Sequence, residues 1–255
     1  MVARYAIGLP TVGEFGAPQT LLDLATAAER YGWDGVHLWD HLLYHRADWP
    51  VTSSTVAAAA IAGATTRLRI ILTVALPRRQ VQDVARDAAA IDELSGRRLT
   101  LLATIGSMDR EYADFGLDPD LRARGRTLDR QLARLTELWT DWGVPGVPIW
   151  CGGRWPNTAG LRRAARFDGV MPTFAEQRTR NVAPADFAAA AEFVRARSAD
   201  PVEIAVEGAT TGAEAAGVLQ PYVEAGLTWW VEATGWWRGG PAAAMSRIAA
   251  GPPTD

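Results

Sequence analysis

Short strand-like runs alternate eight times with longer runs of helical periodicity along this chain. Alternation of this kind is typical of βα units, in which parallel strands pair and helices cover them. The expected strands are Ala3 to Leu9, Gly35 to Asp40, Arg69 to Leu76, Leu99 to Ile105, Val147 to Cys151, Gly169 to Thr173, Glu203 to Ala209 and Thr228 to Ala233. The expected helices are Pro18 to Tyr31, Ser54 to Thr65, Val81 to Leu94, Arg124 to Trp142, Asn157 to Phe167, Pro184 to Arg197, Ala213 to Ala225 and Pro241 to Ala250.

Eight units without an evident linker predict a single domain over residues 1–255, folded as a closed (β/α)₈ barrel. An open doubly wound sheet is the alternative. Glycines at the expected helix ends, Gly32, Gly96, Gly143 and Gly226, suit the left-handed conformation of a C-terminal cap. In a barrel of this kind the functional side chains lie at the carboxyl ends of the strands.

The charged residues exclude several classes of protein. All 26 basic residues are arginine, which removes a P-loop lysine, a Schiff-base aldolase and a pyridoxal enzyme. A net charge of -3 argues against a nucleic-acid partner.

The longest apolar stretch, Ser54 to Ala64, is too short to cross a bilayer, and Met1 to Pro10 does not resemble a signal peptide, so we expect a cytoplasmic protein that acts on a small molecule.

The second strand and the residues after it carry all three histidines, His37, His41 and His45. Their four-residue spacing could suggest a metal site, but His37 belongs to a strand, where four residues span more than about 13 Å, so no metal is expected. Strand alternation turns His37 and Trp39 toward the barrel interior.

The same alternation turns Glu207 inward on the seventh strand and Trp230 and Glu232 inward on the eighth. Carboxylates and a histidine at one mouth predict acid and base chemistry, because buried charges are costly unless they are paired or used. A structural network in which arginines pair with the glutamates is the alternative.

The fifth strand runs into Gly152, Gly153 and Arg154. Two glycines let backbone amides approach an anion, and an arginine adds a guanidinium fork. The lone cysteine, Cys151, has no evident base beside it and is read as a small buried residue rather than a nucleophile.

Tryptophan is abundant, with 11 residues, and six lie at or beyond expected strand ends: Trp39, Trp49, Trp155, Trp230, Trp236 and Trp237. They predict an aromatic pocket for a planar or bulky apolar ligand. Packing of the barrel rim is the alternative.

The chain resembles the bacterial luciferase-like superfamily of flavin- and deazaflavin-dependent oxidoreductases and monooxygenases. Residues that carry the resemblance extend over nearly the whole chain: Ala27 to Val36, Asp40 to Leu42, Arg67 to Ile70 with Thr73 and Val74, Ala89 to Leu99, Glu111 to Gly116, Pro148 to Gly153, Arg163 to Gly169, Ala225 to Trp230, and Arg247 to Pro253.

The resemblance implies a reduced flavin or deazaflavin ring in the barrel mouth, with Asp40 and His41 near its reacting edge and a bulge around Thr73 and Val74, often with a non-proline cis peptide. Asp40, His41, Thr73 and Val74 resemble the coenzyme F-420 branch more than the FMN branch. The implied cofactor contacts are Asp40, Thr73, Val74, Thr104, Gly106, Cys151, Gly152, Gly153 and Arg154. The resemblance implies Asp40 and His41 as catalytic residues, and strand alternation adds Glu207 and Glu232. The expected substrate pocket is His37, Trp39, Trp155, Trp230 and Trp236.

One strand departs from the family pattern. The fourth strand usually ends in a glycine-rich run, whereas here Leu102 and Thr104 carry side chains that could crowd the cofactor. Two alternatives therefore stay open: a cofactor-free enzyme that uses His41, Glu207 and Glu232 for acid and base chemistry, and a non-catalytic flavin-binding homologue.

Barrels of this family commonly pair through the helices after the second and third strands. The corresponding segments here, Val56 to Ala64 and Val81 to Leu94, are rich in alanine, and small side chains allow close helix approach. We expect a homodimer. Light scattering should report twice the chain mass, and a monomer across micromolar concentrations would contradict this expectation.

Overall fold

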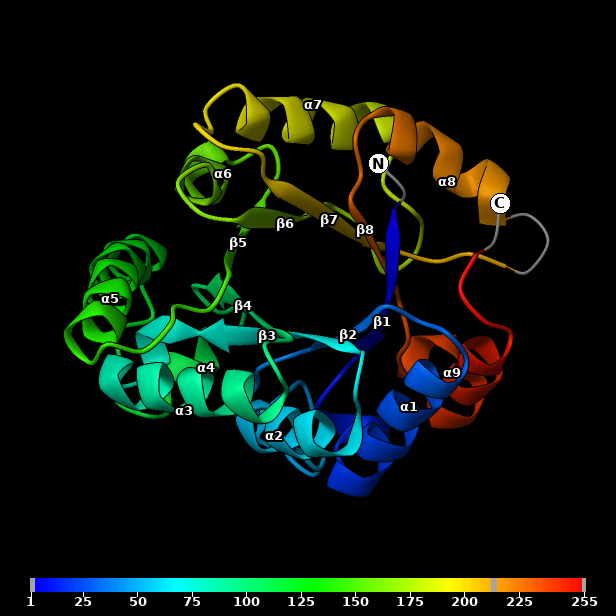
Figure 1. Ribbon diagram of the computed structural model, residues 1–255, viewed down its shortest axis with the longest axis horizontal. Helices are drawn as coiled ribbons and strands as arrows, with labels where there is room; N and C mark the ends of the chain where they lie inside the picture. The colour runs from blue at the N-terminus through cyan, green and yellow to red at the C-terminus, as the bar shows by residue number, and fades with distance from the viewer. Residues whose placement is uncertain (1–2, 212–214, 254–255) are drawn as a thin grey trace.

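The computed structural model describes residues 3–211 and 215–253, and its strands close into a barrel in the order β1 to β8, each parallel to its neighbours. Figure 1 looks along this barrel, with the strands in the centre and the helices around them. The strands are β1 (Arg4–Leu9), β2 (Gly35–Leu38), β3 (Arg69–Ala75), β4 (Leu99–Thr104), β5 (Ile149–Arg154), β6 (Gly169–Thr173), β7 (Glu203–Gly208) and β8 (Trp229–Glu232). The predicted (β/α)₈ barrel is confirmed.

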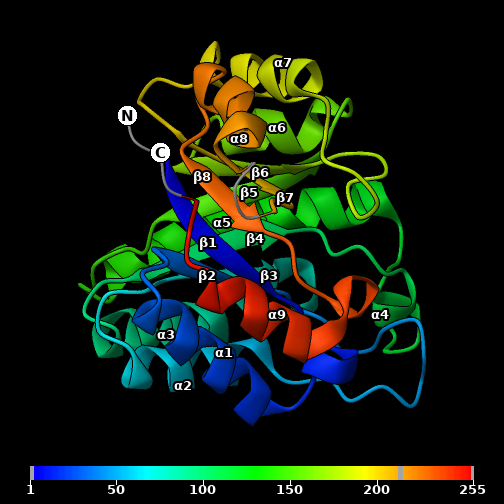
Figure 2. The same ribbon diagram turned by 90° about the vertical axis from the view of Figure 1, so that its right-hand side faces the viewer.

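Helices follow the strands and cover the outside of the sheet (Figures 1 and 2). They are α1 (Pro18–Arg30), α2 (Ser54–Ala64), α3 (Val81–Leu94), α4 (Arg110–Ala113), α5 (Leu121–Asp141), α6 (Thr158–Ala164), α7 (Pro184–Arg195), α8 (Ala215–Glu224) and α9 (Gly240–Ala249). The start of the predicted helix Ala213 to Ala225 lies outside the described residues. Within the described ranges, no helix combines the length and the apolar character that a bilayer crossing requires.

Two boundaries differ from the sequence prediction for local reasons. Helix α5 begins at Leu121 rather than at Arg124, because the Asp120 side chain accepts a hydrogen bond from the Ala123 amide at 2.7 Å and so caps an earlier turn. Strand β5 runs to Arg154 rather than ending at Cys151, because Gly152, Gly153 and Arg154 pair with Met171, Pro172 and Thr173 of β6. Gly152 and Gly153, which were expected to follow the strand, therefore belong to it.

The lower part of the barrel interior is a closed apolar layer. Its members, one or two from each strand except β2, are Ala6, Ile71, Leu102, Trp150, Met171, Ala205, Trp229 and Val231. Below this layer, Glu203 accepts hydrogen bonds from the indole groups of Trp150 at 3.2 Å and Trp229 at 3.3 Å, and it also pairs with Arg4. Two tryptophans thus fill the barrel centre with their polar atoms satisfied, which leaves the other end to carry function.

Strand β5 and helix α6 contact each other through glycine. A Cβ on Gly160 would lie 2.6 Å from the Gly153 Cα and 2.7 Å from the Gly152 carbonyl oxygen, so neither backbone leaves room for a methyl group. The contact fixes α6 against the end of β5 (Figure 1).

We predict that Gly160→Ala lowers the free energy of unfolding by about 1 to 3 kcal/mol, because the added methyl group meets backbone that cannot rotate away. The matched control is Gly63→Ala in α2, where an added Cβ meets nothing within 4 Å. Helix propensity alone should raise its stability by about 0.5 to 1 kcal/mol. Urea unfolding measures both variants, and equal effects would contradict the packing role of Gly160.

Candidate functional site at the barrel mouth

Small and polar side chains form the interior layer above the apolar one. Gly8, Thr73, Thr104 and Gly152 each lie two residues beyond a member of the apolar layer on the same strand. A Cβ on Gly8 would lie 3.5 Å from Glu207 Oε2, and one on Gly152 would lie 3.0 Å from Thr104 Cγ2. Two of the positions have no side chain and two have a threonine. The layer therefore suits the close approach of a flat ring.

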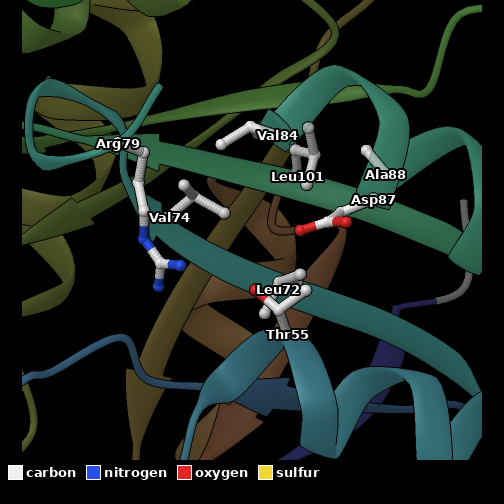
Figure 3. A pocket seen from close by; sticks show the side chains of 8 residues that line it. All are labelled: Thr55, Leu72, Val74, Arg79, Val84, Asp87, Ala88 and Leu101. Atoms are coloured by element: carbon white, nitrogen blue, oxygen red, sulfur yellow. The ribbon is translucent and has the colours of Figure 1, made fainter. Parts of the chain in front are cut away.

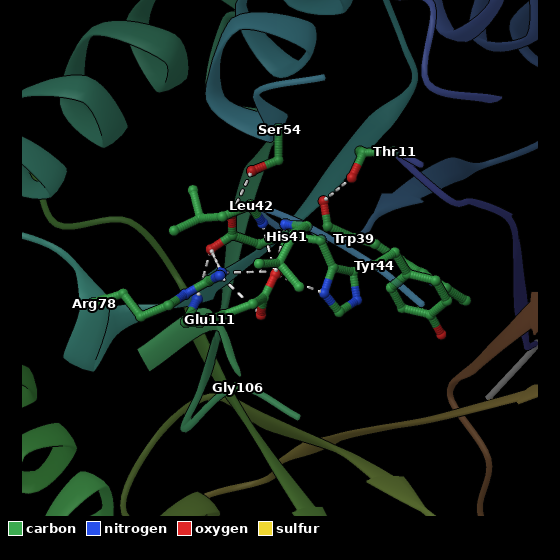
Figure 4. Close-up of polar contacts among 12 residues, drawn as sticks. Thr11, Trp39, His41, Leu42, Tyr44, Ser54, Arg78, Gly106 and Glu111 are labelled. Atoms are coloured by element: carbon green, nitrogen blue, oxygen red, sulfur yellow. Dashed lines mark hydrogen bonds and ion pairs between the residues drawn. The ribbon is translucent and has the colours of Figure 1, made fainter. Parts of the chain in front are cut away.

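His41 lies at this mouth in contact with a carboxylate that comes from a distant part of the chain. Its Nδ1 is 3.1 Å from Glu111 Oε1, and the same oxygen accepts hydrogen bonds from the amides of Leu42 at 2.6 Å and Leu43 at 3.3 Å. The other carboxylate oxygen of Glu111 forms an ion pair with Arg78 at 2.8 Å. Figure 4 shows His41 and Arg78 converging on Glu111.

The charge of Glu111 is stabilised where it stands. Burial acts to raise its pKa, but the bond from His41, the guanidinium of Arg78 and the Leu42 amide outweigh burial and hold the pKa below its usual range. The fixed carboxylate therefore orients the His41 imidazole and favours a proton on its Nδ1. Only the side chain of His41 reaches solvent, at 10 % exposure against 0 % for Glu111.

Asp40 lies behind this pair and is enclosed by protein. It accepts hydrogen bonds from the Ala75 amide at 2.8 Å and from Ser54 at 3.2 Å, and it forms ion pairs with Arg79 at 2.7 Å and Arg78 at 3.1 Å. Burial acts to raise the pKa of Asp40, but Arg79, Arg78 and the Ala75 amide hold it below its usual range. Asp40 thereby joins the ends of β2 and β3.

His37 and Glu207 face each other inside the barrel, as the strand alternation predicted. His37 Nε2 is 2.8 Å from the Thr73 hydroxyl, and His37 Nδ1, which is buried without a hydrogen-bond partner, is 3.9 Å from Glu207 Oε2. Burial lowers the pKa of His37 to about 4 and raises the pKa of Glu207 to about 7. Both groups are therefore available in neutral form near neutral pH.

Along the eighth strand, the side chains that face the barrel interior are not the predicted ones but their neighbours in the sequence. Trp229 and Val231 face the interior, whereas Trp230 lies outside the sheet, with its ring centroid 5.4 Å from that of Tyr222 on α8. Glu232 also lies outside, where it accepts from the Thr210 amide and hydroxyl, both at 2.8 Å, and pairs with Arg247 of α9 at 3.4 Å. Their predicted positions in the mouth were wrong, because adjacent tryptophans leave the inward face of this strand undetermined by hydrophobicity.

Two predicted cofactor contacts also point away from the interior. Val74 faces a small cavity between β3 and the helices α2 and α3, with Leu72, Val84 and Leu101 (Figure 3). Cys151 is fully buried on the helix side of β5, where burial raises its pKa to about 12 and keeps the thiol neutral. The predicted bulge is absent, since Thr73 and Val74 pair with Leu102 and Ala103 in regular register.

The remaining predicted cofactor contacts divide between the mouth and the helix side of β5. Thr104 accepts a hydrogen bond from the Gly106 amide at 3.2 Å and packs its methyl group over Gly152. Gly153 faces α6, and Arg154 is exposed at the end of β5. The expected crowding is therefore limited to Thr104, because Leu102 belongs to the apolar layer below.

Five aromatic side chains gather over the mouth: Trp39, Tyr44, Trp49, Trp236 and Trp237. Trp39 stacks on Trp237 at 5.8 Å between centroids and lies 5.9 Å from the His41 ring. Trp155 is not part of this group, because it packs against Phe193 of α7. These five residues, here called the aromatic wall, come from the connections after β2 and β8. The predicted contribution of Trp155 was wrong.

Sequence reasoning did not identify four residues that the structure places at the mouth, Glu111, Arg78, Tyr44 and Arg178, the last with its guanidinium 5.7 Å from the Tyr44 ring centroid. Glu111 lies on the four-residue helix α4, 70 positions from His41, so no local pattern connects the two. The one available signal was the resemblance of Glu111 to Gly116 to the family. Across the residues that the structure describes, no group of three or more potential metal ligands occurs.

The profile of the luciferase-like monooxygenase family matches residues 4–234. The chain therefore belongs to this family. A search of curated proteins found no match.

Solved structures with the same fold share little sequence with this chain. An F-420-dependent secondary alcohol dehydrogenase superposes with a TM-score of 0.74 at 17 % identity, over 91 % of this chain and 93 % of that one. An F-420-dependent tetrahydromethanopterin reductase from Methanopyrus kandleri gives 0.69 at 14 % identity, over 98 % and 97 %. A monooxygenase from Streptomyces bottropensis gives 0.66 at 18 % identity, over 96 % and 80 %.

We predict that Glu207→Gln changes the pH dependence of stability. Because burial raises the folded-state pKa of Glu207 to about 7, the folded protein keeps a proton that the unfolded chain releases above its ordinary value of 4.5. The contribution of Glu207 to stability therefore falls as pH rises from about 4.5 to about 7, and the glutamine variant lacks this loss. Its free energy of unfolding, relative to wild type, should rise by about 1 to 3 kcal/mol over that interval.

Urea unfolding at a series of pH values measures this difference. The neighbouring His37 acts in the opposite sense, because burial lowers its pKa to about 4, and comparison of variant with wild type at each pH removes that shared contribution. A difference that stays constant between pH 4.5 and 7 would show that Glu207 is not titrating in this range.

Proposed function

We propose that this chain is an oxidoreductase or monooxygenase that holds a reduced flavin or deazaflavin ring in the barrel mouth and transforms a small organic substrate there. The observation that carries the proposal is the His41 and Glu111 pair, 3.1 Å apart, beside an interior layer of glycine and threonine. Family membership supports it, as do the cofactors named for the structures of the same fold.

The residues at the mouth fit a ring of this kind. Gly8, Thr73, Thr104 and Gly152 leave its inner side free of large side chains, and the buried His37 Nδ1 has no hydrogen-bond partner of its own. Thr104, Gly106, Gly152 and Arg154 would hold the cofactor from β4 and β5. When bound, the cofactor would supply the hydride or activate oxygen.

The work of the protein is then proton transfer and positioning. His41 holds or moves a proton at its Nε2, because Glu111 engages its Nδ1. Arg78 and two backbone amides fix Glu111, and Asp40 fixes Arg78. We therefore assign Asp40 and Glu111 to positioning and His41 to proton transfer, while the aromatic wall excludes water from the mouth.

The alternative of a cofactor-free acid and base enzyme loses one of its residues, since Glu232 lies outside the barrel. His41 and Glu207 remain for such a reaction. Absorbance titration of coenzyme F-420 and of FMN decides between the two proposals. We expect one of them to bind with saturation and a shifted spectrum, and absence of binding by both would transfer the function to the cofactor-free reaction.

We predict that His41→Ala lowers turnover by about 10²-fold to 10⁴-fold and leaves cofactor affinity nearly unchanged, because it removes one general acid or base. Glu111→Gln should lower turnover less and move the pH optimum, because the imidazole keeps its place but loses the facing charge. Turnover is followed through the cofactor absorbance with a panel of candidate substrates.

The matched control is His45→Ala, an exposed histidine on the same connection, which should keep wild-type turnover. If His41→Ala retains full turnover and binds cofactor poorly, His41 is a binding contact and the proton-transfer role passes to Glu207.

A further inference from the structure

The guanidinium group of Arg178 lies among the aromatic side chains over the mouth. Its Cζ is 5.5 Å from the ring centroid of Trp39, 5.7 Å from Tyr44, 5.9 Å from Trp236 and 5.4 Å from Trp237. It also donates a hydrogen bond to the Tyr44 hydroxyl. Ring faces on several sides hold this cation in place, since each contact of this type stabilises a cation by about 0.5 to 2 kcal/mol.

The segment that carries Arg178 is fastened to the end of β7. Gln177 donates to the Glu207 carbonyl at 2.7 Å and accepts from the Phe174 amide at 3.0 Å. Asn181 exchanges two hydrogen bonds of 2.8 Å with the backbone of Ala209. The position of Arg178 above the mouth is therefore set by the scaffold.

A second guanidinium, that of Arg238, contacts the backbone of Arg178. Arg238 follows Trp236 and Trp237 after β8, and its side chain donates to the Arg178 carbonyl at 3.5 Å. In the described part of the chain, neither arginine forms an ion pair with a carboxylate within 4 Å. By contrast, Arg78, Arg79 and Arg124 each form an ion pair with a carboxylate.

Two buried donors at the same place have no acceptor. The Nε of Arg238 and the indole Nε1 of Trp237 are both buried without a hydrogen-bond partner. Buried donors are costly to leave unpaired, by about 1 to 3 kcal/mol each. Among the described residues, the mouth therefore offers two cations that have no carboxylate within 4 Å and two buried donors that have no acceptor.

We propose that the substrate of this site is an organic acid, whose carboxylate is bound by Arg178 and Arg238 while its apolar or planar body lies against Trp39 and Trp237. The inference rests on the proposed function and names its substrate class. Guanidinium groups match carboxylates geometrically, and aromatic walls suit a planar body. A cationic substrate is disfavoured, because Arg178 already occupies the ring faces that would recognise it.

Glu207, a carboxyl group inside the barrel, is compatible with a bound anion. The positive charges of Arg178 and Arg238 act to lower the pKa of Glu207, but burial outweighs them. Since burial raises its pKa to about 7, Glu207 is protonated in slightly acid solution and then donates rather than repels.

The test uses the cofactor-free protein with benzoate and phenylacetate as probes, followed by tryptophan fluorescence and calorimetry. Benzamide is the neutral counterpart and benzylamine the cationic one. We expect wild type to bind at least one of the acids about 10-fold or more tighter than benzamide, because a charge-assisted hydrogen bond contributes about 1.5 to 3 kcal/mol. Arg178→Gln should lose this preference, and Arg178→Lys should retain part of it.

The matched control is Arg180→Gln on the same connection, because Arg180 pairs with Glu176 at 2.7 Å and is not part of the aromatic group. It should bind the acids as wild type does. Circular dichroism establishes that each variant is folded, and Arg238→Gln provides an independent variant if Arg178→Gln is not.

Three results would overturn the proposal: no saturable binding of either acid to wild type, unchanged binding by both glutamine variants, or a preference for benzylamine. The cofactors are titrated into the same variants. If Arg178→Gln weakens F-420 or FMN but not the acids, Arg178 serves the cofactor and the proposal is wrong. Because acid binding is measured without cofactor, failure of cofactor binding alone leaves this test intact and refutes only the proposed function.

Discussion

The mouth of this barrel depends on a buried chain of alternating charges. Asp40, Arg78 and Glu111 join the ends of β2 and β3 to helix α4, and the side chains of all three are at most 1 % exposed. Removal of one partner from such a network leaves an unpaired buried charge, at a cost of about 3 to 5 kcal/mol. The ion pair with Arg78 fixes the position of Glu111, and Glu111 in turn fixes the His41 ring. The residue that faces solvent is therefore positioned by residues that do not.

The interior of the barrel consists of two layers that differ in polarity. Trp150, Trp229 and their neighbours fill the lower part with apolar side chains and stabilise the closed sheet. The upper layer consists of glycine, threonine, His37 and Glu207, and desolvation there lowers the pKa of His37 to about 4 and raises that of Glu207 to about 7, so that each group favours its neutral form. Apolar packing thus dominates one end of the barrel, and polar and titratable groups gather at the other, where this fold usually carries its functional residues.

Local pattern predicted the elements well and the site less well. The eight strands were found because their apolar runs are short and regularly separated, and the four glycines expected at helix ends have φ between 61° and 87°. Alternation placed His37 and Glu207 correctly. It failed on β8, where Trp229 and Trp230 are equally apolar, and it was silent on Glu111 and Arg178, which reach the mouth only because the barrel closes.

We propose that His41, held by Glu111, works beside a flavin-type ring in the upper layer. A crystal structure of the protein grown with coenzyme F-420 or with FMN tests it most directly. The account predicts ring density over Gly8, Thr73 and Gly152, with His41 Nε2 within about 3.5 Å of a ring or substrate atom. Density for the ring at any other place, or a His41 side chain turned away from it, would contradict the account.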